Sequence, residues 1–189
     1  VLFRSQWGID SLPVSIEGKG TSPTEAGGYN VPTDFEAKVT YANGIPMFIK
    51  DQGENGILFV GDRGRLFVNR GKLTGSPVEE LSRRPFPWTD WKLYKHDDHD
   101  RPLRSDKLEA IISHMANFYD CIRTRNPPIS DVESQHRSVS TCHLANISIR
   151  LGRPLRWDPV AEKFKDDPEA DRMLSRESRD PYKIGRAHV

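Results

Sequence analysis

The feature that most constrains the fold is a change of hydrophobic period along the chain. From Phe35 to Tyr41 apolar and polar residues alternate one by one, and Asn43-Gly44 follows directly. Alternation with a period of two predicts a half-buried strand, and Asn-Gly predicts a hairpin because both residues tolerate positive φ. Beyond Asp106 the period lengthens to that of an amphipathic helix. Strands followed by helices indicate an α+β fold, with helices on one face of an antiparallel sheet.

Other segments in the first half of the chain also carry strand patterns. Strands are predicted at residues 14–19, 35–41, 46–51, 55–61 and 65–71, with a short addition at 71–75. Short turns between these segments favour an open, mainly antiparallel meander. The segment Ile-Leu-Phe-Val at 57–60 is apolar on both faces of its strand. We therefore expect one face to pack on helices and the other to be covered by a partner.

Two helices are predicted in the second half of the chain. Asp106 caps the first helix, and Asn126-Pro127-Pro128 ends it because proline cannot continue a helix. The second helix begins at Ser130, where Glu133 completes a capping box, and Gly152 ends it in the left-handed conformation. Apolar residues occupy more than one stripe of this second helix, so we expect it to be largely buried. The tail after it predicts one short strand and a charged helical segment.

Composition excludes several classes of protein. The chain has 189 residues, enough for one domain with a core. Its 28 basic and 27 acidic residues leave a net charge of +1, whereas a nucleic-acid-binding domain usually has a basic face. No apolar run reaches the length of about 18 residues that predicts a membrane span. Cys121 and Cys142 are too few for a disulfide framework, and we expect both to be buried free thiols.

Three groups of residues are candidates for chemistry. His96–Asp100 (HDDHD) supplies metal-ligand types, but a solvated loop is expected because metal sites draw ligands from separate elements. The glycines of 61–64 (GDRG) lie between two strands, so they predict a hairpin turn and not a phosphate loop. Trp88, Trp91 and Trp157 are expected to anchor loops and the tail on the sheet edge, with carbohydrate stacking as the alternative.

The second helix also carries a polar stripe, made of His136, Ser140, His143 and Arg150. Unpaired buried polar groups cost about 1–3 kcal/mol each, so we expect the stripe to hydrogen-bond to loops and the tail. In the alternative, its N-terminal end, His136 with Arg137, faces a cleft or a neighbouring domain. A Ser/His/Asp triad is a further alternative, although no serine lies in a G-x-S-x-G elbow.

The two ends of the chain are expected to be foreign to the fold. The DNA GTGCTCTTCCGATCT encodes Val1–Ser5, and its reverse complement, AGATCGGAAGAGCAC, read in another frame leads to Ile-Gly-Arg-Ala-His. That peptide is the tail without its final Val, so one sequencing-library adapter accounts for both ends. We therefore exclude Val1–Ser5 and Ile184–Val189 from the predicted fold as adapter-derived.

A long pattern in the second half resembles a known family. The pattern covers residues 118–159 (FYDCIRTRNPPISDVESQHRSVSTCHLANISIRLGRPLRWDP), 162–164 and 167–183. It resembles the C-terminal region of bacterial Gfo/Idh/MocA-type oxidoreductases. That family includes glucose–fructose oxidoreductase and inositol dehydrogenase. Residues 29–44 (YNVPTDFEAKVTYANG) and 54–71 (ENGILFVGDRGRLFVNRG) resemble the sheet region of the same branch.

The resemblance implies a parent protein with two domains. Gln6-Trp7-Gly8 is similar to the end of a family segment, IAQWG, that follows a helix carrying a His and an Asp. The family's Rossmann domain, its dinucleotide-binding glycines, its Glu-Lys-Pro lysine and its catalytic helix would then precede residue 1. No catalytic, cofactor-binding or metal-binding residue is expected within this chain. Residues 6–183 would form the C-terminal substrate and oligomerisation domain.

The resemblance also implies partners and a substrate cleft. The helical side would contact the Rossmann domain, and the exposed sheet face would make a homo-oligomer. Loops at the sheet edge would close over a small sugar or polyol. By position, the substrate-cleft candidates are Tyr29, Asn30, His136 and Arg137. A Tyr or Asn could hydrogen-bond hydroxyls and an Arg could hold a carboxylate. Neither nucleic acid nor a membrane is an expected partner.

The implied function is that of an NAD(P)-dependent oxidoreductase. The full-length parent would use NAD or NADP to transfer a hydride to or from a sugar, cyclitol or related polyol. No cofactor and no turnover are expected of this chain alone. A non-enzymatic binding or assembly module, and a metal-dependent hydrolase that uses the loop at His96–Asp100, are the alternatives. The compartment is left open between the cytoplasm and export to the periplasm.

Overall fold

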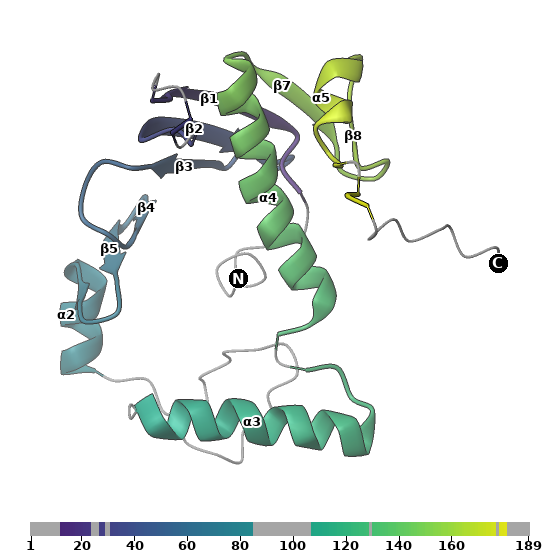
Figure 1. Ribbon diagram of the computed structural model, residues 1–189. Coiled ribbons are helices and arrows are strands. Elements are labelled where there is room, and N and C mark those ends of the chain that lie inside the picture. Colours follow the sequence, from purple (N-terminus) through teal and green to yellow (C-terminus); the bar gives the residue numbers. More distant parts are fainter. Residues whose placement is uncertain are drawn as a thin grey trace. The chain divides into compact units, whose positions relative to one another are not determined.

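The chain forms two units, each with its own antiparallel sheet (Figure 1). The computed structural model describes residues 12–23, 27–28, 31–84, 107–128, 130–176 and 178–180. Unit 1 comprises Val1–Trp7 with Gly53–Gln135, and unit 2 comprises Gly8–Gln52 with His136–Val189. None of the described helices has the length and apolar character needed to cross a membrane.

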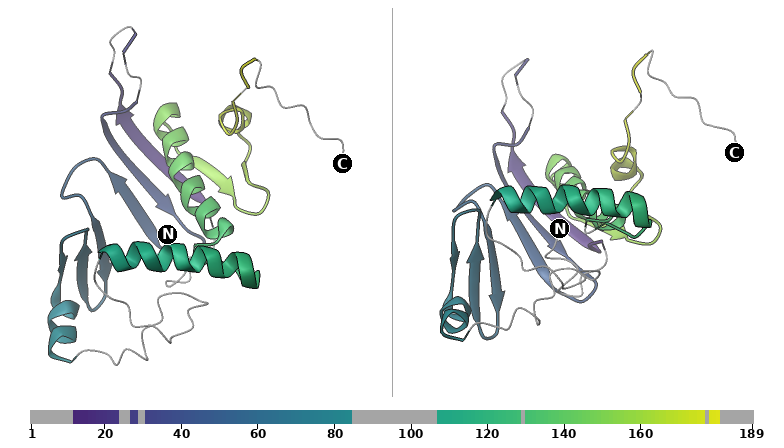
Figure 2. Two further views of the ribbon diagram at one scale, coloured as in Figure 1. Left: turned by 60° about the horizontal axis from the view of Figure 1, so that its bottom comes forward. Right: turned by 90° about the horizontal axis from the view of Figure 1, so that it is seen from below.

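Unit 2 is built on a five-stranded sheet with the order β3-β2-β1-β7-β8. Its strands, all paired antiparallel, are β1 (Ser15–Thr21), β2 (Asp34–Thr40), β3 (Pro46–Lys50), β7 (Leu155–Asp158) and β8 (Lys163–Phe164). Helix α4 (Val132–Leu151) crosses one face of this sheet, and the short helix α5 (Pro168–Arg172) lies beside β8 (Figure 1 and Figure 2). The α+β class and the open antiparallel sheet are therefore confirmed.

Unit 1 holds a second sheet, which the sequence did not predict as separate. Its strands are β4 (Ile57–Gly61), β5 (Gly64–Val68) and β6 (Leu73–Thr74). The expectation of one continuous meander is wrong, because a run of bends at residues 51–56, with Gly53 at φ 111°, separates β3 from β4. The five-stranded sheet is extended on its other side, where the tail strand β7 pairs with β1 and Trp157 N donates to Val14 O at 2.9 Å.

The described helices of unit 1 are α2 (Ser76–Arg83), which packs on β5 and β6, and α3 (Lys107–Thr124). Helix α2 was not predicted, although a proline in its first turn, after Gly75, is a recognised start signal. Helix α3 ends before Asn126, as predicted. Its proposed cap, Asp106, lies outside the described residues.

The Asn43-Gly44 hairpin is confirmed, but its geometry differs from the prediction. Gly44 N donates to Tyr41 O at 2.9 Å, and Tyr41 N donates to Ile45 O at 3.1 Å. This is a turn closed by a single left-handed residue, and only Gly44 has positive φ, at 81°. Asn43 instead accepts a hydrogen bond from Ile45 N on its side-chain oxygen, at 3.1 Å.

The core of unit 2 lies between α4 and the sheet. The alternation in β2 is confirmed, since Ala37, Val39 and Tyr41 are all buried. Helix α4 is buried only in its C-terminal half, which corrects the expectation of a largely buried helix. Val132, in its first turn, is 80% exposed. The buried residues of the core are Leu12, Ile16, Ala37, Val39, Tyr41, Leu144, Ala145, Ile147, Leu155, Trp157, Phe164 and Ala170.

Both cysteines are free, as expected, but neither is buried. Cys121 on α3 is half-buried and Cys142 on α4 is exposed. Cys142 neighbours the buried Thr141 but follows it by one position, so it projects from a different side of the helix. The prediction of buried thiols was therefore wrong.

Helix α4 approaches β1 at two glycines. A Cβ added to Gly18 would lie 2.8 Å from both Cγ1 and N of Ile149, and one added to Gly20 would lie 2.9 Å from Cγ2 of the same residue. Real side chains do not tolerate such distances, so glycine is required for this approach. The contact places the last turns of α4 directly on the backbone of β1.

One buried hydroxyl joins the helix to the strand. Ser148 is completely buried on α4, and its Oγ accepts a hydrogen bond from Gly18 N at 2.8 Å. The same Oγ donates to Arg153 O at 2.9 Å. Strand β7 pairs with only Ser15 and Ile16 of β1, so Gly18 N–H faces the side of β1 where no ladder partner is paired. Ser148 satisfies that donor.

Substituting Gly18 tests the close approach. We expect Gly18→Ala to lower the free energy of unfolding by about 1–3 kcal/mol, because the added methyl overpacks against Ile149. Urea unfolding followed by circular dichroism measures this change. Gly61→Ala is the matched strand control, since a Cβ there would meet only Gly64 O at 3.9 Å. Equal stability of the two variants would contradict the proposed contact.

Substituting Ser148 tests the hydrogen-bond bridge. We expect Ser148→Ala to cost about 1–3 kcal/mol of stability, because Gly18 N–H is left buried without an acceptor. Ser140→Ala on the same helix, at a half-buried position, is expected to change stability by less than about 0.5 kcal/mol. Hydrogen exchange at the Gly18 amide should become faster in the first variant and stay unchanged in the second.

Candidate functional site

The cap of α4 lies one residue later than predicted. Asp131 is its cap: the carboxylate accepts from Ser134 N and from Ser134 Oγ, both at 2.8 Å. These bonds, the backbone one first, hold the pKa of Asp131 below its usual value. Ser130 bonds instead to the side chain of Gln135. The predicted cap at Ser130 is corrected because a carboxylate is the stronger acceptor at this position.

His136 lies in the second turn of α4 and contacts the tail. Its Nε2 is 2.9 Å from Oε1 of Glu162, and both side chains are about half exposed. Glu162 stands at φ 49°, in the turn between β7 and β8. Asp158 holds that turn by accepting from Val160 N and Ala161 N at 2.9 and 3.0 Å. The turn therefore aims a carboxylate at the imidazole.

The hydrogen bonds that hold this turn also change the pKa of Asp158. They keep that pKa below its usual value, and the bond from the Ala161 N–H has the largest effect. Asp158 is thus a charged acceptor that fixes the turn. The pair formed by His136 and Glu162 can hydrogen-bond a ligand hydroxyl from the helix and from the turn at once.

Arg137 follows His136 on the helix and is half-buried. Its backbone carbonyl accepts from Thr141 Oγ1 at 2.9 Å. Consecutive helix residues point about 100° apart, so the two candidates project in different directions. His136 and Arg137 therefore lie at the same end of unit 2, but their side chains do not point the same way.

The remaining polar stripe behaves differently from the prediction. Contact with the tail is confirmed for His136, through Glu162. His143 and Arg150 are exposed, so they do not form the expected buried stripe. The buried polar side chains of α4 are Thr141 and Ser148. The sequence did not predict their burial, because serine and threonine do not stand out in a hydrophobic pattern.

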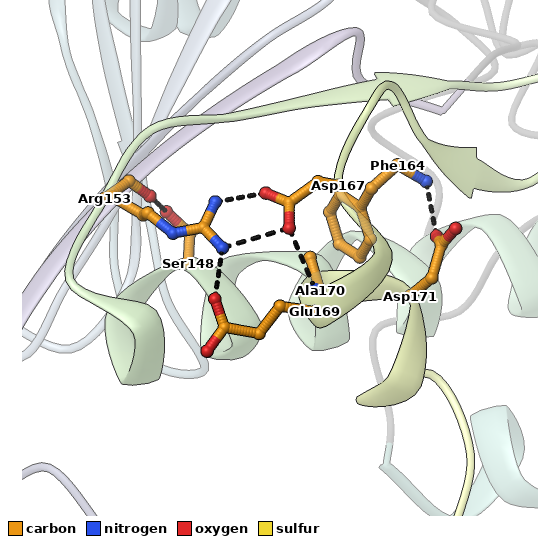
Figure 3. Close-up of polar contacts among 7 residues, drawn as sticks. All are labelled: Ser148, Arg153, Phe164, Asp167, Glu169, Ala170 and Asp171. Carbon is orange, nitrogen blue, oxygen red and sulfur yellow. Dashed lines mark hydrogen bonds and ion pairs between the residues drawn. The ribbon is translucent and has the colours of Figure 1, made fainter.

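A charged cluster joins the end of α4 to α5 (Figure 3). Both terminal nitrogens of Arg153 hydrogen-bond to the Asp167 carboxylate in a bidentate ion pair. Its Nη2 also lies 2.7 Å from Oε2 of Glu169. Asp167 in turn caps α5 by accepting from Ala170 N at 3.1 Å. Nearby, Phe164 N donates to Asp171 at 2.8 Å. The cluster fixes the tail to the last turn of α4.

The arginine controls the charge of its acidic partner. Hydrogen bonds from Arg153, followed by the Ala170 N–H, lower the pKa of Asp167 from its usual 3.8 to about 2. The same pairing, with Asp167 contributing more than Glu169, raises the pKa of Arg153. Arg153 and Asp167 are thus both charged throughout the range in which proteins normally work. The geometry of the cluster suits structural support.

Lowering the pH tests this cluster. Because the pKa of Asp167 is lower in the folded chain, its contribution to stability is complete above about pH 4 and is lost as the pH falls towards 2. We expect the thermal midpoint to fall over that window. Asp167→Asn should be less stable at neutral pH and should show a shallower fall in acid.

A neighbouring acid supplies the control for this measurement. Asp166 is 89% exposed and contacts Arg156 at 3.1 Å. Asp166→Asn should therefore keep the acid-dependent fall of the unsubstituted chain. A profile of Asp167→Asn that coincides with that of the unsubstituted chain would contradict the assignment.

Several predicted residues lie outside the described part of the chain. These are Tyr29, Asn30, the metal-type loop His96–Asp100, Trp88 and Trp91.

Trp157 does lie within the described residues. It is 3% exposed and packs edge to face on Phe164, with ring centroids 4.9 Å apart. It anchors the tail strands on the sheet, as expected, and its burial leaves no ring face for a carbohydrate.

No group of three or more His, Cys, Asp or Glu side chains that could hold a metal ion comes together among the described residues. The glycine turn at 61–64 joins antiparallel strands β4 and β5, as predicted, so no helix N-terminus follows it to receive a phosphate. At the N-terminal half of α4, His136 and Arg137, with Glu162 from the turn after β7, can hydrogen-bond a ligand.

A comparison with family models decides the relationship. Residues 88–184, just over half of the chain, match the model described as "Oxidoreductase family, C-terminal alpha/beta domain", of the Gfo/Idh/MocA group. The chain belongs to this Gfo/Idh/MocA oxidoreductase family. The match includes α3, α4, β7, β8 and α5, and so contains His136, Ser148 and the Arg153 cluster. No curated protein and no solved structure matches the chain.

Proposed function

We propose that this chain is the substrate-side and assembly domain of an NAD(P)-dependent oxidoreductase that acts on a sugar, cyclitol or related polyol. The single observation that carries the proposal is the family match over residues 88–184, which describes a C-terminal domain. The reaction would be hydride transfer between the nicotinamide and a carbon that bears a hydroxyl. The nucleotide would be held by a Rossmann domain outside the described residues.

The substrate contacts are assigned to the N-terminal half of α4. His136 and Glu162 present a donor and an acceptor 2.9 Å apart at an exposed position, which suits the hydroxyls of a polyol. Arg137 supplies a planar, permanent cation for a carboxylate or a hydroxyl oxygen. Tyr29 and Asn30, which lie between β1 and β2 in the sequence, complete the proposed set.

The assembly role is assigned to the apolar surface of unit 1. Ile57, Leu58, Val60 and Leu73 on the three-stranded sheet are each about half exposed or more. The outer residues of the five-stranded sheet are instead charged: Glu36 lies 3.1 Å from Lys50 and 4.0 Å from Lys19 across three strands. Apolar surface favours a stable contact between subunits more than such a charged face does.

The activity test uses the whole protein. The DNA on either side of this reading frame should encode a strand–turn–helix with a G-x-G-x-x-G fingerprint. The protein expressed from that longer frame should reduce NAD or NADP with at least one member of a panel of sugars and cyclitols. The 189-residue chain alone should show no turnover with any of them. Reduction of NAD by the chain alone, or a longer protein without a dinucleotide fingerprint, would contradict the proposal.

The role of Arg137 is tested by steady-state kinetics in that longer protein. We expect Arg137→Ala to raise KM about tenfold or more, because a hydrogen bond to a charged group contributes about 1.5–3 kcal/mol. The kcat should change less, since the contact forms in the ground state as well as the transition state. Arg150→Ala, an exposed arginine on the same helix, is the control and should leave KM unchanged. Identical KM values for the two variants would remove Arg137 from the cleft.

A further inference from the structure

Glu162 has a backbone conformation that glutamate rarely adopts. Its φ is 49°, in the left-handed region, where a Cβ crowds the backbone and glycine is the usual residue. It ends the turn between β7 and β8, and hairpin loops favour glycine where they turn left-handed. Strained residues persist where neighbouring contacts hold them, and they gather at ligand sites. A glutamate at this position therefore indicates a role for its carboxylate.

The carboxylate contacts a side chain of α4. Oε1 of Glu162 lies 2.9 Å from Nε2 of His136. The turn that carries Glu162 is held at its start, where Asp158 accepts from Val160 N and Ala161 N. The place of the carboxylate is thus fixed by the backbone of the turn, and the imidazole that it meets is fixed by the helix.

This contact decides which ring nitrogen of His136 carries the proton. A carboxylate accepts hydrogen bonds and has none to donate, so the nitrogen that faces Glu162, Nε2, is the protonated one. In a neutral imidazole the other nitrogen is then an acceptor. Nδ1 is therefore the ring atom left to accept from a ligand. The side chain of His136 is 52% exposed, which leaves the ring accessible to a small molecule.

We propose that Glu162 is a positioning residue for substrate binding: it holds the proton of His136 on Nε2, so that Nδ1 accepts a hydrogen bond from a substrate hydroxyl. This role rests on the proposed function and refines it, because the donor of the pair is used between the two residues. A hydroxyl can donate to Nδ1, whereas a carboxylate or a carbonyl oxygen cannot. At this atom the chain recognises an alcohol group of a polyol and not an acid or keto group.

A second left-handed acid in the tail provides a matched control. Asp166 has φ 57°, and its carboxylate contacts Arg156. Glu162→Gly and Asp166→Gly each relieve a strained side chain and each remove an exposed contact, which contributes little to stability. Neither variant is therefore expected to lower the thermal midpoint. Only Glu162→Gly removes the partner of His136.

Nuclear magnetic resonance of the 189-residue chain tests the position of the proton. At about pH 9 imidazoles are neutral, and the nitrogen chemical shifts of each ring show which nitrogen is protonated. We expect His136, identified by the signals lost in His136→Ala, to carry its proton on Nε2. Glu162→Gly should populate both tautomers and so bring the Nδ1 and Nε2 shifts closer together, whereas Asp166→Gly should change neither. A proton on Nδ1, or shifts unchanged in Glu162→Gly, would overturn the assignment.

Steady-state kinetics of the longer protein tests the use of Nδ1. We expect Glu162→Gly to raise KM about three- to tenfold, the effect of losing one hydrogen bond, and to change kcat less. Because Glu162 acts through His136, Glu162→Gly should add nothing to the effect of His136→Ala. Glu162→Gln keeps an oxygen that accepts from Nε2 and should recover most of the loss.

Three kinetic results would contradict the positioning role. These are additive effects in the double variant of Glu162 and His136, a Glu162→Gln variant as impaired as Glu162→Gly, and an equal rise of KM in Asp166→Gly. Each would mean that Glu162 acts on the substrate, or on the fold, without His136.

Failure of the proposed function would give a different result. If the longer protein reduced neither NAD nor NADP, the proposed function would fail, and the proton of His136 would still be located in the chain alone. Titration of that chain with myo-inositol then decides whether Nδ1 accepts from a hydroxyl. A saturable change of the Nδ1 shift that is weaker in Glu162→Gly supports the positioning role, and an unchanged shift overturns it.

Discussion

The fold of unit 2 depends on the close approach of α4 to β1. Gly18 and Gly20 leave no side chain between strand and helix, so Ile149 lies directly on the strand backbone. Ser148 then supplies the acceptor that the Gly18 N–H lacks. Because β7 pairs with only two residues of β1, the helix takes over where the ladder ends. Packing and hydrogen bonding are thus satisfied by adjacent residues of one helix turn.

The same helix turn connects the sheet to the tail. Ser148 donates to Arg153 O, and the Arg153 side chain reaches Asp167 at the start of α5. Beyond this turn, α4 is exposed towards its beginning, where His136 meets Glu162. The helix therefore has a structural end and an accessible end. Membership of the Gfo/Idh/MocA family gives the accessible end its proposed role in substrate contact.

Strong periodicity predicted most of the elements, and local chemistry explains the errors. The alternation in β2 correctly predicted a strand, and the glycine after α4 correctly predicted the end of a helix. Each of these features is determined by a single strong signal in the sequence. The separate sheet of unit 1 was missed, because the pattern of a strand does not show which other strand it pairs with, and β4 pairs with β5 and not with β3. The glycines at 18 and 20 did carry a signal: glycine within a strand pattern marks close backbone approach. Of the cleft candidates, only His136 and Arg137 lie among the described residues.

The geometry of the Arg153 cluster has a consequence for recognising related chains. Only a planar guanidinium can form bidentate hydrogen bonds to one carboxylate while it contacts a second acid, so lysine could not replace Arg153. The contact joins positions fourteen residues apart, and the acids stand on either side of Pro168. An arginine just after a helix-ending glycine, followed at that interval by Asp-Pro-Glu, thus forms a compact sequence signature. A distant homologue that carries it should fold its own C-terminal extension in the same way, even where little else can be aligned.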